Sequence, residues 1–245
     1  MADLEARHLA DLTFPQVSSA LRALSASYVE RRATIATGAP LAGAGKRAAF
    51  ALFYGPLHFL LVRAIVSALP GATRPVRTLV DLGCGTGVAG AAWASLLAAR
   101  PEVVAVDRHA WALAEAAETL SAFGLRYRTV RADVMSAGVR PKPPAALVAA
   151  FAINELSDES RAALLPRLLD RAGRGDRVLI VEPIARFVAR WWDGWRREIE
   201  AAGGRADEWR IPVELPPIVE KLDRAAGLNH RELTGRSLYL PGLRT

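Results

Sequence analysis

The strongest constraint on the fold is an alternation that begins at residue 77. From there, short apolar runs rich in Val, Leu and Ala alternate with longer segments of helical periodicity. Such runs are typical of strands buried on both faces, and the segments between them are typical of crossover helices. The pattern therefore predicts an α/β fold in which helices cover both faces of a parallel sheet.

The expected elements follow one another without an internal repeat. Strands are expected over residues 77–82, 102–107, 126–133, 145–151 and 177–183, and helices over residues 87–99, 110–123 and 158–172. Two more helices are expected after Pro183, one reaching about residue 202 and one over residues 216–227. The stretch LNHRELTGRSLYL is expected to form two antiparallel strands joined by a tight turn at Thr234-Gly235.

The part of the chain before this alternation has a different pattern. Residues 15–33 and 46–69 have helical periodicity, and the second segment is expected to bend at Gly55-Pro56. The stretch PGATRP marks a boundary near residue 72. We therefore expect an N-terminal helical extension, residues 1–72, that acts as a lid on the substrate side, and an α/β domain over residues 73–245.

Composition narrows the class of protein. The chain has 245 residues, of which 51% are apolar, so it can bury a sizeable core. The one cysteine, Cys84, excludes an intrachain disulfide and a multi-cysteine metal site, and no metal is expected. The net charge of +7 comes mostly from arginine, a bias that raises the isoelectric point without requiring a nucleic-acid partner. The acidic N-terminus and the short, interrupted apolar run at residues 48–62 favour a cytoplasmic protein without membrane association.

A glycine-rich loop, in the stretch LVDLGCGTGVAG, follows the first expected strand. A tight turn from strand to helix lets a ligand approach the backbone and the amides at the helix N-terminus. Gly85, Gly87 and Gly90 satisfy the G-x-G-x-x-G pattern of dinucleotide sites. Gly83, Gly85 and Gly87 also satisfy G-x-G-x-G, with Asp81 before them. A carboxylate there would repel a diphosphate but tolerate a ligand that carries an ammonium and a sulfonium.

Acidic residues recur at the ends of the next two strands. Asp81, Asp107 and Asp133 are spaced 26 residues apart, which places all three at the carboxyl edge of the expected sheet. A carboxylate at Asp107 can accept hydrogen bonds from ribose hydroxyls, and one at Asp133 can accept from an adenine amino group. The sequence therefore favours a nucleoside ligand at this edge.

These motifs together resemble those of the class I S-adenosylmethionine-dependent methyltransferases. VDLGCGTG is similar to the first motif of that family, VVAVDRH to its second-strand acidic motif, RADV to its third motif, and ELTGRSLYL to its antiparallel strand pair. The resemblance covers residues 75–245. It implies a Rossmann-like, doubly wound sheet of seven mostly parallel strands that ends in an antiparallel hairpin. It also implies S-adenosylmethionine as the methyl donor and S-adenosylhomocysteine as the product.

The same resemblance implies a set of donor-binding residues. Gly83 and Gly85 would line the methionine portion, and Asp107 would bind the ribose. Asp133 and Val134 would bind the adenine. The other residues expected at the donor are Asp81, Cys84, Gly87, and Arg108 and His109 beside the adenine ring. Outside the resemblance, helical spacing puts Tyr54 on one face with His58, where it could cover the donor's carboxylate or pack in a core.

The acceptor side is expected in the stretch FAINEL after the fourth strand. Because a sulfonium is already activated, the protein mainly positions the nucleophile, and a base is needed only if the acceptor must lose a proton. Asn154 and Glu155 are the candidates, although Asn154 could instead cap a turn and Glu155 could be solvated. His58 is a candidate base or, alternatively, a core residue. FAINEL lacks the Asn/Asp-Pro-Pro-aromatic signature used for exocyclic amino groups of bases.

The identity of the acceptor stays open between two classes. A small organic molecule is the first expectation, and RNA or a ribosomal component is the alternative, with a non-catalytic assembly role also considered. The stretches YVERR, NEL and VEP are similar to a methyltransferase-like family associated with the small mitochondrial ribosomal subunit, but this chain lacks the cysteine cluster of its metal-binding members. The segment ARFVARWWDGWRREIE could grip RNA or be the apolar face of a surface helix; it contains Arg186, Arg190, Trp191, Trp192, Trp195, Arg196 and Arg197. No pattern in the sequence defines an oligomeric state.

Overall fold

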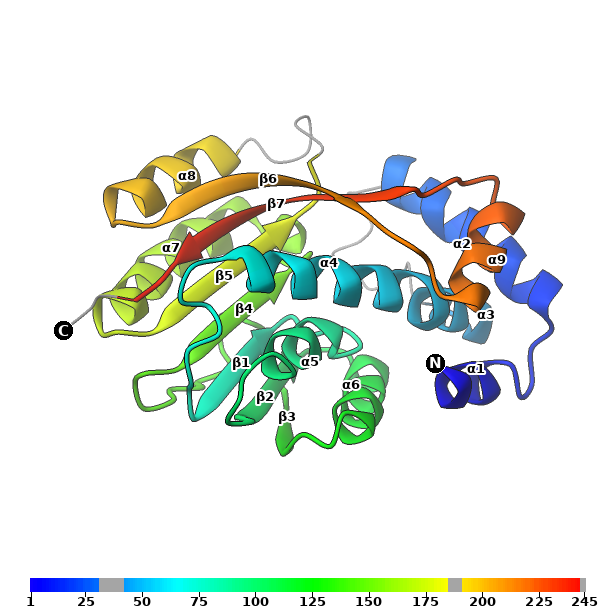
Figure 1. Ribbon diagram of the computed structural model, residues 1–245, viewed down its shortest axis with the longest axis horizontal. Coiled ribbons are helices and arrows are strands. Elements are labelled where there is room, and N and C mark those ends of the chain that lie inside the picture. Colours follow the sequence, from blue (N-terminus) through cyan, green and yellow to red (C-terminus); the bar gives the residue numbers. More distant parts are fainter. Residues whose placement is uncertain (31–41, 185–190, 243–245) are drawn as a thin grey trace. The chain divides into compact units, whose positions relative to one another are not determined.

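A computed structural model describes residues 1–30, 42–184 and 191–242 of the chain (Figure 1). The strands are β1 (Thr78–Leu82), β2 (Glu102–Asp107), β3 (Tyr127–Arg131), β4 (Ala146–Ala150), β5 (Arg177–Glu182), β6 (Arg205–Pro212) and β7 (Glu232–Leu240). The helices are α1 (Ala2–His8), α2 (Phe14–Glu30), α3 (Ala44–Ala49), α4 (Gly55–Ala68), α5 (Val88–Ala94), α6 (Ala110–Ala122), α7 (Asp158–Gly173), α8 (Trp192–Ala201) and α9 (Pro217–Ala225). A π-helical turn, η3 (Phe50–Tyr54), joins α3 to α4, and a 3₁₀ turn, η4 (Ile153–Glu155), follows β4.

The seven strands form one sheet in the order β3-β2-β1-β4-β5-β7-β6. The pairs β1–β2, β1–β4, β2–β3 and β4–β5 are parallel, and β7 pairs antiparallel with β5. The strand order reverses between β1 and β4, which is where ligands bind in open α/β sheets. The expected α/β class, the seven mostly parallel strands and the terminal antiparallel hairpin are confirmed.

The expected position of the hairpin turn is wrong. β7 runs unbroken from Glu232 to Leu240 through Thr234-Gly235, and its neighbour in the sheet is β6. A Cβ at Gly235 would lie 2.8 Å from Cδ2 of Leu61, so this glycine serves close packing and not a turn. The sequence of β6, RADEWRIP, hid this strand because charged residues interrupt its apolar alternation.

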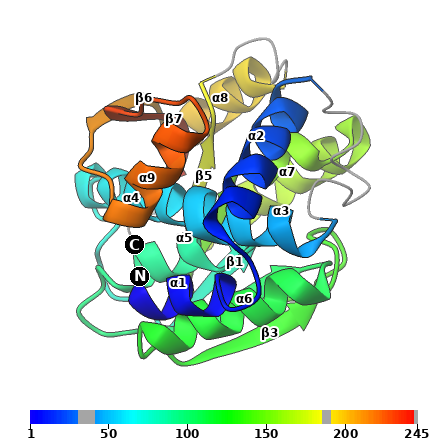
Figure 2. The same cartoon turned by 90° about the vertical axis from the view of Figure 1, so that its right-hand side faces the viewer.

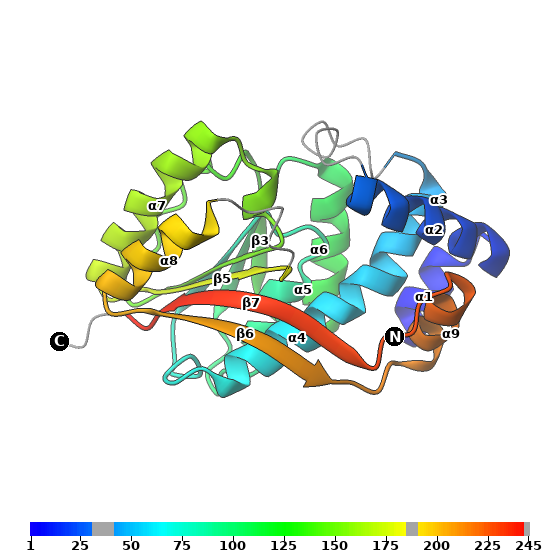
Figure 3. The same ribbon diagram turned by 90° about the horizontal axis from the view of Figure 1, so that it is seen from above.

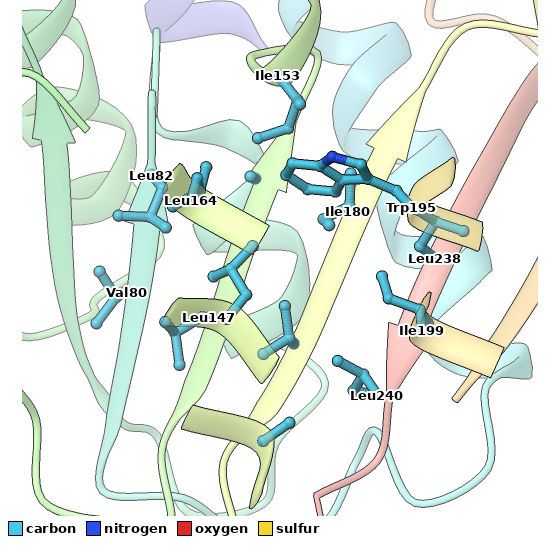
Figure 4. Packing of buried hydrophobic residues seen from close by; sticks show 14 of the residues in the cluster. Val80, Leu82, Leu147, Ile153, Leu164, Ile180, Trp195, Ile199, Leu238 and Leu240 are labelled. Carbon is cyan, nitrogen blue, oxygen red and sulfur yellow. The ribbon is translucent and has the colours of Figure 1, made fainter. Parts of the chain in front are cut away.

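The helices cover both faces of the sheet. Leu164 and Leu168 of α7 and Ile199 of α8 share one cluster with Val80 and Ile180 of the strands (Figures 3 and 4). Successive strand residues point to opposite faces, so Asp81, next to Val80, faces the other side. There the backbone amide of Gly90 in α5 donates to its carboxylate, which places α5 on the second face.

The helical run from Ala44 to Ala68 is continuous and changes geometry at η3, immediately before the expected bend at Gly55-Pro56. A proline lacks the amide donor that a regular helix needs, and a π turn is a common way to absorb such a break. By length and composition alone this run could cross a membrane, but more than half of its apolar window is buried inside the protein, as in a core helix.

The chain divides into two compact units. The first comprises Met1–His58 and Ile211–Leu233, and the second comprises Phe59–Arg210 and Thr234–Thr245. In the first unit α2 contacts both α3 and α9 (Figure 2), and Nη1 of Arg22 donates to the carbonyl of Ala225 at 2.7 Å. The expected domain boundary at residue 72 and the lid function of the N-terminal part stay predictions.

A buried guanidinium fixes the turn that leads into β1. Arg177, at the start of β5, is 4% exposed. Its Nη1 donates to the carbonyls of Gly71 and Arg74 at 2.8 and 2.6 Å, and its Nη2 donates to that of Pro75 at 3.1 Å. These carbonyls lie in a part-buried turn without regular secondary structure, where the arginine supplies donors that no sheet or helix ladder provides.

We therefore expect Arg177→Met to lower the free energy of unfolding by about 3 kcal/mol, because it removes the charged donor that holds these carbonyls together. Urea denaturation monitored by tryptophan fluorescence measures this loss. The matched control is Arg174→Met, since Arg174 is exposed and pairs with Asp170 on the surface. The control should cost less than about 0.5 kcal/mol, and equal losses in the two variants would contradict the assignment.

Candidate functional site

Most of the residues expected at the ligand lie where β1, β2, β3 and β4 end. The glycine loop after β1 lies against the segment after β4. The approach is so close that a Cβ at Gly83 would lie 2.7 Å from Cβ of Ala152. The same loop is bonded to the end of β2 through Asp107, and the segment after β4 is bonded to the end of β5 through Glu182. One connected site therefore lies at the carboxyl edge of the second unit.

The glycine loop has no room for side chains at two positions. Gly83 has φ 68° and the close approach to Ala152. Gly87 has φ 74°, and a Cβ there would lie 2.9 Å from Cα of Ala116. Gly87 is also the N-cap of α5, so the loop leads directly into a helix N-terminus. The loop therefore presents bare backbone, as a site for a closely held ligand requires.

Asp107 is held in one orientation by two backbone amides. Its Oδ2 accepts from Gly85 N at 3.0 Å, and its Oδ1 accepts from His109 N at 2.8 Å. Each carboxylate oxygen keeps a free lone pair, so the half-buried group can still accept hydrogen bonds from a diol. Arg108 is exposed beside it, and His109 is the N-cap residue of α6.

Asp81 is buried and binds the backbone of α5. Its side chain is 1% exposed within β1, and Oδ2 accepts from Gly90 N at 2.8 Å. Oδ1 has no hydrogen-bond partner among the described residues. A Cβ at Gly90 would lie 2.9 Å from Oδ2, so the third glycine of the G-x-G-x-x-G pattern allows α5 to pack against β1. Burial raises the pKa of Asp81 to about 7. The hydrogen bond from the Gly90 amide lowers this pKa, and the charge of Asp107 raises it.

Two further residues border the loop. Cys84 is buried, and its amide donates to Val106 O at 2.9 Å, which anchors the loop to β2. Burial, with Asp81 and Asp107, raises the pKa of the Cys84 thiol well above its usual value, so this thiol stays protonated at neutral pH. Val134 approaches to 3.9 Å from a Cβ placed on Gly83.

The segment after β3 also carries Asp133. This residue is exposed, and its Oδ1 accepts from Met135 N at 2.8 Å. The remaining lone pairs of the carboxylate are available for a ligand donor. The three spaced aspartates thus differ in environment, with Asp81 buried, Asp107 half-buried and Asp133 exposed.

The segment after β4 is hydrogen-bonded to Glu182, the last residue of β5. Ile153 N and Asn154 N donate to Oε1 of Glu182 at 2.8 and 3.2 Å, and Asn154 Nδ2 donates to Oε2 at 2.6 Å. The amide oxygen of Asn154 accepts from Trp191 Nε1 at 2.9 Å. Just before them, Phe151 has φ 58°, a strained conformation for a bulky residue. Strain of this kind persists only where the surroundings hold it.

The pairing of Asn154 with Glu182 was not predicted. Asn154 follows β4 and Glu182 ends β5, and their places near the ends of two expected strands were the one signal available in the sequence. Glu182 is fully buried, and this burial raises its pKa to about 8. The hydrogen bonds from Asn154 and Ile153 and the charge of Arg236 lower the pKa, and the charge of Glu155 raises it. Glu155 itself is exposed. Desolvation by the surrounding protein raises its pKa, the charge of Arg108 lowers it, and the charge of Asp107 raises it further.

Tyr54 and His58 belong to the first unit, whereas the other expected site residues belong to the second. The Tyr54 hydroxyl is 2.9 Å from Ser25 Oγ, and the rings of Tyr54 and His58 lie 6.0 Å apart. Burial lowers the pKa of His58 to about 3, so its imidazole is neutral at pH 7 and only weakly basic. Burial likewise raises the pKa of Tyr54.

The tryptophans of α8 face the core. Trp192 and Trp195 are 7% and 5% exposed, and Trp195 lies in the cluster under the sheet (Figure 4). The guanidinium of Arg236 lies 3.9 Å above the ring of Trp192. Arg196 pairs with Glu200 on the surface. Arg186 and Arg190 lie outside the described residues. Within the described ranges, no group of three His, Cys, Asp or Glu side chains could hold a metal ion.

Comparisons with known proteins agree with this arrangement. Residues 79–173 match the family model described as a methyltransferase domain. A solved S-adenosylmethionine-dependent methyltransferase from Aquifex aeolicus is 16% identical with a TM-score of 0.51, over 76% of this chain and 93% of that one. Magnesium protoporphyrin IX methyltransferase from Synechocystis PCC 6803, solved with bound S-adenosylmethionine, is 16% identical with a TM-score of 0.50, over 75% and 78%. At these identities the likeness shows the fold. A search of curated proteins gives no match.

The raised pKa of Asp81 makes stability depend on pH. A carboxyl group whose pKa rises on folding stabilises the fold fully below its ordinary pKa of 3.8 and loses that contribution as pH rises through about 7. Asp81→Asn removes this titration. We expect the unfolding free energy of the native chain, relative to the variant, to fall by roughly 3 kcal/mol between pH 4.5 and pH 7.5.

Urea denaturation of both proteins across that range measures the difference. Glu182 titrates in the same direction, but it is common to both proteins and cancels in the comparison. A difference in stability that does not change with pH would show that Asp81 keeps an ordinary pKa in the folded chain.

Proposed function

We propose that this chain is a class I S-adenosylmethionine-dependent methyltransferase and that it methylates a small organic molecule at the carboxyl edge of its sheet. When bound, S-adenosylmethionine supplies a methyl group on a positively charged sulfur, which needs no further activation. The chain's own residues must therefore hold the donor, place the acceptor and receive any proton that the acceptor loses.

The residues at the edge fit such a donor. The glycine loop, with positive φ at Gly83 and Gly85, presents backbone groups to the methionine portion. Asp107, oriented by two amides, has lone pairs for the two ribose hydroxyls. Asp133 and Val134, beside the same loop, provide an acceptor and an apolar contact for adenine. We assign the donor to these residues.

The observation that carries the choice of acceptor is the burial of the α8 tryptophans. The basic and aromatic segment around them was the main feature in the sequence that favoured RNA. Trp192 and Trp195 pack in the core, so their rings are not available to stack on bases. The edge itself carries the carboxylates of Asp107, Asp133 and Glu155, which repel a phosphodiester backbone. These features favour a small acceptor over RNA or a ribosomal component.

Glu155 is the residue that we assign to proton removal. Its pKa is raised by its surroundings, which brings its basicity closer to that needed at neutral pH. It reaches solvent at the end of η4, on the segment that contacts the glycine loop. His58 is much less suited to this task, since an imidazole with a pKa of about 3 binds a proton weakly at pH 7.

The proposal is tested by following a radioactive methyl group. The enzyme is incubated with methyl-labelled S-adenosylmethionine and a host-cell extract that ultrafiltration has divided into small solutes and macromolecules. Label is expected in the small solutes and to fall about a hundredfold with Glu155→Gln, because general-base catalysis contributes at least this factor. S-Adenosylhomocysteine affinity should remain unchanged in this variant. Label in RNA or ribosomal protein instead would overturn the proposal.

The donor assignment predicts a specific effect of adding one methyl group to the loop. Gly83→Ala places a Cβ 2.7 Å from that of Ala152 at φ 68°, so the loop must move. S-Adenosylhomocysteine binding, measured by isothermal titration calorimetry, should weaken by at least about tenfold, which corresponds to about 1.4 kcal/mol of misplacement.

Gly203→Ala is the matched control. Gly203 also has a positive φ, 81°, but a Cβ there meets nothing within 4 Å, and the residue follows α8. Its affinity for S-adenosylhomocysteine should equal that of the native chain. If both variants bind equally well, the glycine loop does not hold the donor.

A further inference from the structure

The hydrogen bonds around Asn154 form a chain with one direction. Trp191 Nε1 can only donate, and it donates to Oδ1 of Asn154. Asn154 Nδ2 donates to Oε2 of Glu182, and Oε1 accepts from two backbone amides, so both oxygens of Glu182 act as acceptors. The two ends of the chain therefore fix which way the Asn154 amide points. Both polar atoms of that side chain are engaged within the protein.

The other oxygen of Glu182 performs a second task. Oε1 accepts from Ile153 N and Asn154 N, the first two amides of η4. The residue at the N-cap position of this turn is Ala152, which has no side-chain acceptor. Glu182 therefore caps η4 from the neighbouring strand, in the manner of a helix N-cap.

The segment held in this way is the one that contacts the donor loop. Ala152 approaches Gly83, and Glu155 ends the same turn. We propose that Glu182 and Asn154 form a positioning pair that holds residues 151–155 against the glycine loop. The two residues act on the reaction through this segment and touch neither donor nor acceptor. This assignment replaces the expectation that Asn154 is a catalytic residue.

The surroundings of the pair favour this role over simple packing. A buried carboxyl group is costly, and an apolar side chain would fill the same space at lower cost. Arg236 is the register partner of Glu182 on β7, and it is 4% exposed above the Trp192 ring. Its charge compensates the carboxylate without taking the oxygens from the amides of η4, because those oxygens accept from Ile153 and Asn154. The carboxylate is thereby kept available as a backbone cap.

The direction of the chain predicts a swap of two residues that restores function. Glu182→Gln introduces a donor, and no orientation of the two amides avoids placing one N–H against another. Asn154→Asp alone removes the amide donor to Oε2 of Glu182 and places two carboxyl groups together. In the double variant Asn154→Asp/Glu182→Gln, the new amide at position 182 caps η4 through its oxygen, and its nitrogen donates to one oxygen of the new carboxylate at position 154. The other oxygen of that carboxylate still accepts from Trp191. All three variants are nearly identical in shape to the native chain.

The readouts are the dissociation constant of S-adenosylhomocysteine and, without ligand, the hydrogen exchange of the Ile153 and Asn154 amides. Each single variant should bind about tenfold or more weakly and exchange faster, since an opposed buried donor or charge costs this much. The double variant should recover most of the affinity and most of the protection of the two amides from exchange. Arg177→Met, destabilised at the opposite end of β5, is the control for lost stability and should keep native affinity.

Two results would overturn the positioning pair. One is a double variant that binds as weakly as the sum of its single changes. The other is a loss of affinity in Arg177→Met equal to that in Glu182→Gln, which would reduce the effect to general instability. If the single variants do not fold, recovery of folding and affinity in the double variant still decides the matter. The inference rests on donor binding at this edge and involves no acceptor, so it stands or fails separately from the proposed small-molecule substrate.

Discussion

Two loops approach each other at the carboxyl edge so closely that one of them has no room for a side chain. Gly83 follows β1 and Ala152 follows β4, and a Cβ on the glycine would lie 2.7 Å from that of the alanine. The position of the loop after β1 therefore depends on the position of the segment after β4. The geometry of the site therefore depends on the contacts that hold both loops to the sheet.

Carboxylates at or near the ends of strands provide that hold. Asp81 accepts from the amide of Gly90, Asp107 from that of Gly85, and Glu182 from that of Ile153. In each case an acidic side chain on one strand binds backbone of a following or neighbouring segment. Backbone amides in loops have no ladder partner, and the carboxyl oxygens satisfy them. Acidic residues at this edge thus have a structural role as well as any role toward a ligand.

Much of the fold could be predicted because it follows from local pattern. The buried runs at β1, β2, β4 and β5 and the glycine loop appear in consecutive residues, and the structure has them near the expected positions. β6 was missed because it is an exposed strand whose sequence has no clear alternation. The turn expected at Gly235 was wrong because the glycine accommodates Leu61, which is distant in sequence. The link between Asn154 and Glu182 was missed for the same reason, since only the order of strands in space brings them together.

The make-up of the first compact unit has a consequence for synthesis of the chain. That unit combines residues 1–58 with residues 211–233, and α9 from the later stretch contacts both α2 and η3. Translation delivers the early stretch long before the later one, and domains fold as their parts emerge from the ribosome. Helix α2 and the turn η3 therefore lack their contacts with α9 through most of elongation. During this interval the nascent N-terminal helices are the part of the molecule most in need of a chaperone.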